Sequence, residues 1–135
     1  MIEVVNRQRR MRIDTRRWSN FATQALAAIG RNESTATIAF VSDKSIRKLN
    51  RQFRGLDKAT DVLSFPAGDE ENLGDIAVSV DRAELQATEN KLALDDEIAQ
   101  LILHGLLHLS GYDHETDNGQ MNRLELRLRK KLGIG

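Results

Sequence analysis

The chain has 135 residues, of which 40% are apolar and 30% are charged, and it contains no cysteine. This length suits one domain with a real core, so we expect a single domain over residues 1–135. No apolar run approaches the roughly 18 residues that a membrane span requires. Without cysteine the chain can form neither disulfides nor thiolate nucleophiles nor cysteine-ligated zinc sites. Residues 1–12 carry arginines where a signal peptide needs an unbroken apolar segment, so we expect a cytoplasmic protein.

Positive and negative charges are segregated along the chain, although the formal net charge is zero. Basic residues dominate three segments, at 7–17, 43–58 and 123–131, whereas residues 69–97 contain ten acidic residues against two basic ones. Such polarity can orient a polyanion over one face of the molecule. The alternative is that each segment is an ordinary solvated helix face.

The predicted elements alternate without a linker. A strand at residues 2–5 is followed by an amphipathic helix, for which Asp14 or Thr15 is the N-cap and which ends near Gly30. A second strand at residues 36–41 leads to a short helix whose apolar and basic residues lie on opposite faces, and which we expect Asp43 to cap.

Two further strands are predicted at residues 62–65 and 75–80. A turn-rich acidic loop separates them, which favours a hairpin with a long connection. The second of these strands leads to a helix from Asp81 to about Glu89.

The C-terminal third contains two more predicted helices. Asp95 or Asp96 begins one that is apolar nearly all round, hence buried, and Gly111 is expected to end it in the left-handed conformation. The final helix opens with Asp117 and Gln120, a capping-box pattern.

All three histidines lie in the sequence HGLLHLSGYDH at residues 104–114. His104 and His108 are one helical turn apart, so both imidazoles project from the same face of the helix and can reach one ion. Gly111 allows the backbone to turn at positive φ, and His114 can then face the first two histidines.

Three histidine ligands on a tetrahedral ion leave one position open for water, as in catalytic zinc sites. Water bound there becomes a nucleophile near neutral pH, because its pKa falls to about 7. The alternative is a set of core histidines with satisfied hydrogen bonds, but each imidazole on the apolar helix would then need its own polar partner. We therefore predict one zinc ion per chain, held by His104, His108 and His114.

The spacing H-x-x-x-H-x-x-G-x-x-H is also that of the metzincin proteases. In those enzymes a glutamate follows the first histidine and takes the proton from the attacking water. Gly105 occupies that position here, so a zinc-dependent peptidase is the disfavoured alternative.

Three motifs together resemble the YbeY family of ribosomal-RNA maturation factors, which are metal-dependent endoribonucleases: HGLLHLSGYDH, LNRQFRGLDKATDVLSFP at residues 49–66 and LGDIAVSV at residues 73–80. The resemblance implies an α+β fold in which helices flank a small mixed sheet. It implies that the three histidines bind zinc and that Arg54 is positioned to contact RNA. It further implies a single-strand-specific endoribonuclease in rRNA processing, acting in maturation of the 3′ end of small-subunit (16S) rRNA and in 70S ribosome quality control.

Residue chemistry agrees with this implication. Hydrolysis of a phosphodiester needs a nucleophile and a group that stabilises charge on the phosphorus oxygens, and metal-activated water and a guanidinium meet these needs. Arg54 is the catalytic candidate because its planar fork can grip a phosphate, whereas the alternative is a solvated loop arginine. The expected partners are ribosomal RNA and ribosomal particles, with a ribosomal protein or an accessory nuclease as further candidates and no membrane.

Some neighbouring polar residues receive only provisional roles. Asp113 and Asp75 are candidate acceptors for the N–H groups of the ligand imidazoles. Asp61 and Ser64 are left without an assigned role, and Tyr112 is equally well explained by packing. A non-catalytic alternative also stays open, in which the metal only staples the helix end of an assembly factor that binds ribosomal RNA or a ribosomal protein.

Overall fold

Residues 2–113 and 115–134 are described by the computed structural model, and they form four strands and five helices. The elements in chain order are β1 (Ile2–Asn6), α1 (Thr15–Ile29), β2 (Thr35–Val41), α2 (Asp43–Arg54), β3 (Val62–Pro66), β4 (Asn72–Ser79), α3 (Val80–Asn90), α4 (Leu94–Leu109) and α5 (Gln120–Leu132). Every element that the sequence pattern predicts is present.

The strands form one mixed sheet in the order β1-β2-β4-β3. Strands β1, β2 and β4 run parallel, and β3 pairs antiparallel with β4 at one edge. The predicted hairpin is therefore confirmed, but β4 begins at Asn72 and takes up part of the predicted loop. The α+β class with a small mixed sheet flanked by helices is confirmed.

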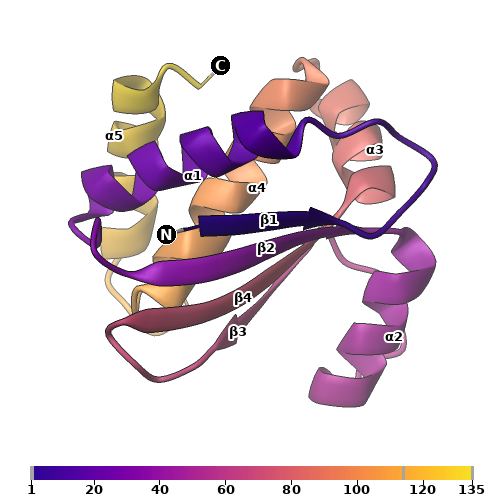
Figure 1. The fold of residues 1–135 in the computed structure, drawn as a ribbon, viewed down its shortest axis with the longest axis horizontal. Helices are drawn as coiled ribbons and strands as arrows, with labels where there is room; N and C mark the ends of the chain where they lie inside the picture. Colours follow the sequence, from indigo (N-terminus) through magenta and orange to yellow (C-terminus); the bar gives the residue numbers. More distant parts are fainter. Residues whose placement is uncertain (1, 114, 135) are drawn as a thin grey trace.

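The helices cover the two faces of the sheet unequally (Figure 1). Helices α1, α3, α4 and α5 lie on one face, and α2 lies on the other. Because alternate residues of a strand point to opposite faces, Ile38 and Ile76 enter the main core beneath α1 and α4. A smaller cluster, formed by Val41, Ile46, Leu63 and Ala77, lies between the sheet and α2.

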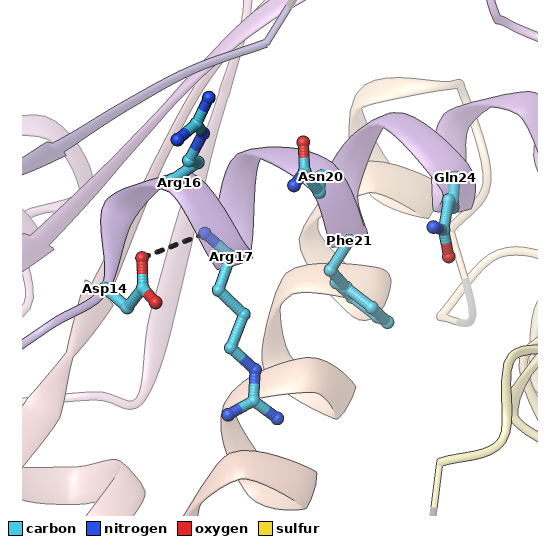
Figure 2. Close-up of a pocket in the computed structure, with 6 residues that line it drawn as sticks. All are labelled: Asp14, Arg16, Arg17, Asn20, Phe21 and Gln24. Atoms are coloured by element: carbon cyan, nitrogen blue, oxygen red, sulfur yellow. Dashed lines mark hydrogen bonds between the residues drawn. The ribbon is translucent and has the colours of Figure 1, made fainter.

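Short polar side chains cap the N-termini of three helices by accepting a backbone hydrogen bond. Asp14 caps α1 as predicted, and its carboxylate accepts a hydrogen bond from the backbone N–H of Arg17 (Figure 2). Ser42, and not Asp43, caps α2, because the Ser42 hydroxyl accepts from Ser45. The Asp43 carboxylate instead accepts a hydrogen bond from Ser79, so the prediction for Asp43 was wrong.

The next three helix starts also differ from the predicted residues by small amounts. Ser79 caps α3, one residue before the helix and two before Asp81. Helix α4 begins at Leu94 without a side-chain cap, and its acidic residues occupy the first turn, where the partial positive charge of the helix N-terminus stabilises them. Asp117 does accept a hydrogen bond from Met121 N–H at the start of α5, but the N-cap residue is Gly119.

Helix α4 is buried along most of its 16 residues, as its apolar sequence predicts. It ends at Leu109, and Gly111 then adopts a φ of 101°, the left-handed conformation expected from the sequence. Among the described residues, no helix is long and apolar enough to cross a membrane.

Gly105 allows α4 to approach the sheet closely. A Cβ atom on this residue would lie 3.0 Å from Cδ1, 3.1 Å from Cγ2 and 3.2 Å from Cγ1 of Ile76 on β4. Ile76 is buried in the main core, so it has little room to move away. The absence of a side chain at residue 105 therefore sets the distance between α4 and β4.

We expect Gly105→Ala to destabilise the protein. Overpacking costs about 1–3 kcal/mol, which outweighs the gain of about 1 kcal/mol from replacing glycine by alanine inside a helix. Urea unfolding measures the change, and Ile76→Val is the matched partner because it removes the nearest methyl group. The penalty of Gly105→Ala should be smaller in the Ile76→Val background; an unchanged or higher free energy of unfolding in the single variant contradicts the packing argument.

Candidate active site

One cavity brings together the arginine and two of the histidines that the sequence singles out. Its volume is about 460 Å³, and it opens between the C-terminal end of α2, edge strand β3, helix α4 and the loop that follows α4. The residues that line it are Arg54, Thr60, Asp61, Val62, Ser64, Pro66, His104, His108, Gly111, Tyr112, Asp113 and Glu115. Residues as far apart in the sequence as Arg54 and Glu115 thus line one cavity.

The two histidines of α4 converge at the cavity wall. Their Nε2 atoms are 3.2 Å apart, and their rings meet edge to face with centroids 4.7 Å apart. Two nitrogens bound at 2.0–2.1 Å to one tetrahedral zinc would be roughly 3.3 Å apart, so the pair has the spacing of two ligands of one ion. The same distance also fits a direct N–H···N hydrogen bond between the rings.

A carboxylate from α5 holds the first histidine. His104 Nδ1 lies 3.0 Å from Glu125 Oε1, and the same carboxylate is 3.9 Å from the guanidinium of Arg129. A hydrogen bond donated by Nδ1 to this carboxylate leaves Nε2, the nitrogen beside His108, as the one that can bind a metal. Glu125 is only 7% exposed, and a buried carboxylate is costly unless it is paired, so its position indicates a specific role.

The sequence reasoning missed Glu125. A detectable signal existed, because Glu125 falls between Met121 and Leu128 on the buried face of α5, and a carboxylate in an apolar stripe needs a partner. The partner could not be identified from the helix alone.

The third predicted ligand, His114, lies outside the described residues. Within residues 2–113 and 115–134, no group of three or more His, Cys, Asp or Glu side chains is arranged to hold a metal. The metal site therefore stays a prediction that rests on the geometry of His104 and His108.

Arg54 is the last residue of α2, and it lines the same cavity as the α4 histidines. It is exposed and makes no salt bridge with any other residue that the structure describes. The chain turns away at Gly55, where the backbone N–H closes the helix on the carbonyl groups of Asn50 and Arg51. The guanidinium is thus available for an anion in the cavity.

Hydrogen bonds from two residues of α2 hold the loop that follows this helix. Buried Asn50 donates a hydrogen bond to the carbonyl of Lys58. Arg47 grips Asp57 with two N–H groups, at 2.9 and 3.1 Å. These hydrogen bonds hold the pKa of the Asp57 carboxyl below its usual value, so any stabilisation by this pair is present above the usual carboxyl pKa and is lost as the pH falls through the lowered one.

The other polar candidates divide between the two faces of the sheet. Ser64 and Asp61 line the cavity; the Ser64 hydroxyl lies 3.4 Å from the carbonyl oxygen of Gly105, and Asp61 accepts a hydrogen bond from the backbone of Val62. Asp113 also lines the cavity. Asp75 lines a groove with Phe65 and Ala77 on the opposite face, so its proposed contact with an imidazole is wrong.

Ion pairs remove much of the charge separation that the sequence suggests. Arg10 pairs with Asp81 and Glu84, and Arg17 pairs with Asp95, so the first basic segment is partly neutralised by the acidic one. On α2, by contrast, Lys44, Lys48 and Arg54 have no salt bridge to a described residue. Helix α2 therefore keeps exposed positive charge, and its last residue, Arg54, brings that charge to the cavity.

Comparison with known proteins places the chain in a family. The model of the YbeY family, described as endoribonuclease YbeY, matches residues 3–133. Endoribonuclease YbeY of Koribacter versatilis is 50% identical over 116 residues, which cover 86% of this chain and 76% of that protein. Endoribonuclease YbeY of Solibacter usitatus is 54% identical over 92 residues, which cover 68% of this chain and 62% of that protein.

A solved structure has the same fold. The solution structure of TM1509 from Thermotoga maritima superposes with a TM-score of 0.71 at 28% identity, covering 98% of this chain and 89% of that one. The family match spans the whole described cavity, from Arg54 to Glu115. This chain belongs to the endoribonuclease YbeY family.

Proposed function

We propose that this protein is a single-strand-specific, metal-dependent endoribonuclease that hydrolyses phosphodiester bonds of RNA. The observation that carries the proposal is the cavity that Arg54 of α2 lines together with the paired imidazoles of His104 and His108. Membership of the endoribonuclease YbeY family supports it. A guanidinium next to a pair of nitrogen ligands suits a phosphodiester, because the reaction develops negative charge on the phosphorus oxygens.

His104, His108 and His114 would hold one zinc ion. Two observations support the fit: the 3.2 Å separation of the two described Nε2 atoms, and the hydrogen bond between His104 Nδ1 and Glu125. Ligand histidines commonly donate their second N–H to a carboxylate in this way. When bound, zinc supplies a water molecule of lowered pKa and a positive charge beside the phosphate.

The protein's own groups then bind and orient the RNA. Arg54 presents parallel N–H donors that can grip two phosphate oxygens. The exposed cations of α2 add nonspecific attraction for the backbone. On the other side, β3 and the loop after α4 form the walls of the cavity, so a nucleotide that enters is held between α2 and α4.

We further propose ribosomal RNA as the substrate, in maturation of the 3′ end of 16S rRNA and in 70S ribosome quality control. Ribosomal particles, a ribosomal protein and an accessory nuclease are the partners proposed with this role, and the cytoplasm is its proposed location. The family resemblance supports these assignments, and the basic surface of α2 agrees with a polyanionic substrate.

A peptidase is disfavoured by the packing of α4. Gly105 occupies the position of the metzincin base, and a Cβ there would meet Ile76 of the sheet. A glutamate at this position would press against the Ile76 side chain, so the helix or the sheet would have to shift to accommodate it. The remaining alternative is a metal-stapled assembly factor without catalysis.

Replacing His108 by alanine should sharply lower the metal content. The substitution removes one of three proposed nitrogen ligands, and zinc sites in proteins need their full ligand set. Elemental analysis of purified protein gives the zinc-to-chain ratio, with Leu126→Ala on the exposed face of α5 as the control. A His108→Ala variant that is as fully metallated as the parent would refute the ligand assignment.

Glu125→Ala should weaken zinc binding by about 10- to 100-fold, because the partner that orients a ligand histidine is lost. Glu125→Gln retains an oxygen that can accept the Nδ1 hydrogen and should lose less. Competition with a chromophoric chelator measures both affinities. Equal affinity in Glu125→Ala and the parent would mean that the carboxylate serves only the packing of α5.

Arg54→Lys should impair cleavage far more than RNA binding. Lysine keeps the positive charge but not the two-pronged grip, and loss of one oriented donor costs about 10²- to 10³-fold in rate. The assay is single-turnover cleavage of an rRNA fragment spanning the immature 3′ end, alone and within ribosomal particles. If the metal-loaded parent binds both substrates and leaves both intact, the assembly-factor alternative replaces the nuclease.

A further inference from the structure

A second cavity lies on the face of the sheet opposite the α4 histidines. Its volume is about 460 Å³, and its lining is mainly apolar. Phe53 and Leu49 of α2 form one wall, and Phe65 of β3 lies beside them with Ala39 and Ala77. Two charged residues, Arg7 and Asp75, also line it. None of these residues takes part in the site described above.

The most exposed large apolar side chain among the described residues lies in this groove. Phe53 is 64% exposed, and its ring meets the ring of Phe65 edge to face with centroids 5.4 Å apart. Packing against Phe65 fixes the position of the Phe53 ring but leaves most of its surface open to solvent. A flat apolar surface of this kind is suited to a planar ligand.

The groove and the histidine cavity lie on opposite faces of the edge strand β3, and neighbouring residues of the chain line the two. Successive residues of a strand point to opposite faces, and accordingly Ser64 lines the histidine cavity while Phe65 lines the groove. At the end of α2 the same division recurs, because Phe53 lines the groove and Arg54 lines the histidine cavity. A polymer that crosses β3 beside the end of α2 would reach both cavities.

We propose that Phe53 and Phe65 form a stacking platform for an unpaired base of the RNA strand whose phosphate lies in the histidine cavity. The proposal rests on the proposed function and extends it to the recognition of single-stranded RNA. Unpaired bases commonly stack on exposed aromatic side chains, and the contact tolerates any base because each has a π-face.

The chemistry of the groove favours a base over a phosphate. Its apolar floor suits the neutral ring, whereas Arg7 and Asp75 provide one donor and one acceptor for the polar edge of a base. The carboxylate of Asp75 would repel a phosphate. The cations of α2, Lys44, Lys48 and Arg54, supply the charge complementarity that favours a nucleic acid over an apolar segment of a protein partner.

The test compares two variants of Phe53 on two ligands. Phe53→Leu keeps an apolar side chain without an aromatic face, and Phe53→Trp enlarges that face. Leu126→Ala removes an apolar side chain that is 52% exposed on α5 and serves as the control. The ligands are a fluorescein-labelled 12-nucleotide oligoadenylate and an abasic ribose-phosphate oligomer of the same length. Fluorescence anisotropy measures the dissociation constants, under conditions where a gel shows the oligomers to be intact.

Phe53→Leu should bind the oligoadenylate at least about five-fold more weakly than the parent, because a base stacked on an aromatic ring contributes that much or more. Phe53→Trp should bind as tightly as the parent or more tightly, and neither variant should change the affinity for the abasic oligomer. Thermal melting confirms that the variants are folded, as expected for so exposed a position.

Three results would overturn the stacking platform. Phe53→Leu could bind the oligoadenylate as tightly as the parent does, or its affinity for the abasic oligomer could fall as much as its affinity for the oligoadenylate. The third is a loss of oligoadenylate affinity in Leu126→Ala as large as that in Phe53→Leu. After the first result, the remaining candidate ligand of the groove is an apolar segment of a protein partner. A different result would refute the proposed function: the parent and Phe53→Trp bind the oligoadenylate as expected, but neither protein cleaves RNA. Cleavage by the parent together with unchanged binding by Phe53→Leu would instead retain the nuclease and remove the platform.

Discussion

The close contact between α4 and β4 at Gly105 is the constraint on which the site depends. Because no Cβ separates Gly105 from Ile76, the histidine turn of α4 lies directly beside the sheet, and the hydroxyl of Ser64 on β3 reaches the backbone of that same residue. The edge strand thereby becomes a wall of the cavity. A larger residue at 105 would press against Ile76, so either that side chain or the helix that carries the imidazoles would have to shift.

A second constraint acts from the other side of α4. Burial of the Glu125 carboxylate is unfavourable by itself, and its pairing with His104 and Arg129 offsets that cost. In return the carboxylate holds the Nδ1 edge of the His104 ring, while Nε2 on the other edge lies 3.2 Å from Nε2 of His108. The C-terminal helix therefore does more than cover the core, since it supplies the hydrogen-bonding partner of a histidine on another helix.

Local patterns predicted the elements and much of the site, whereas contacts between distant segments were predicted poorly. Helical spacing was enough to place His104 and His108 on one face, and a helix-ending glycine was enough to place the turn at Gly111. The error at Asp75 has a simple physical origin: without the register of β4 against its neighbours, the face of an interior strand residue is undetermined. Glu125 was missed because its partner lies 21 positions away, in a different helix.

The charge pattern along the sequence also differs from the charge pattern on the surface of the folded protein. Segregation along the chain suggested three positive surfaces, yet folding brings the acidic segment against the first of them, where Arg10 and Arg17 become paired. Exposed pairs of this kind contribute little to stability, about 0–1 kcal/mol each, but they cancel the local field that would attract a polyanion. Lys44 and Lys48 on α2 are left without such partners among the described residues. Since α2 also ends at the cavity, its cations are placed to attract a polyanion toward that site.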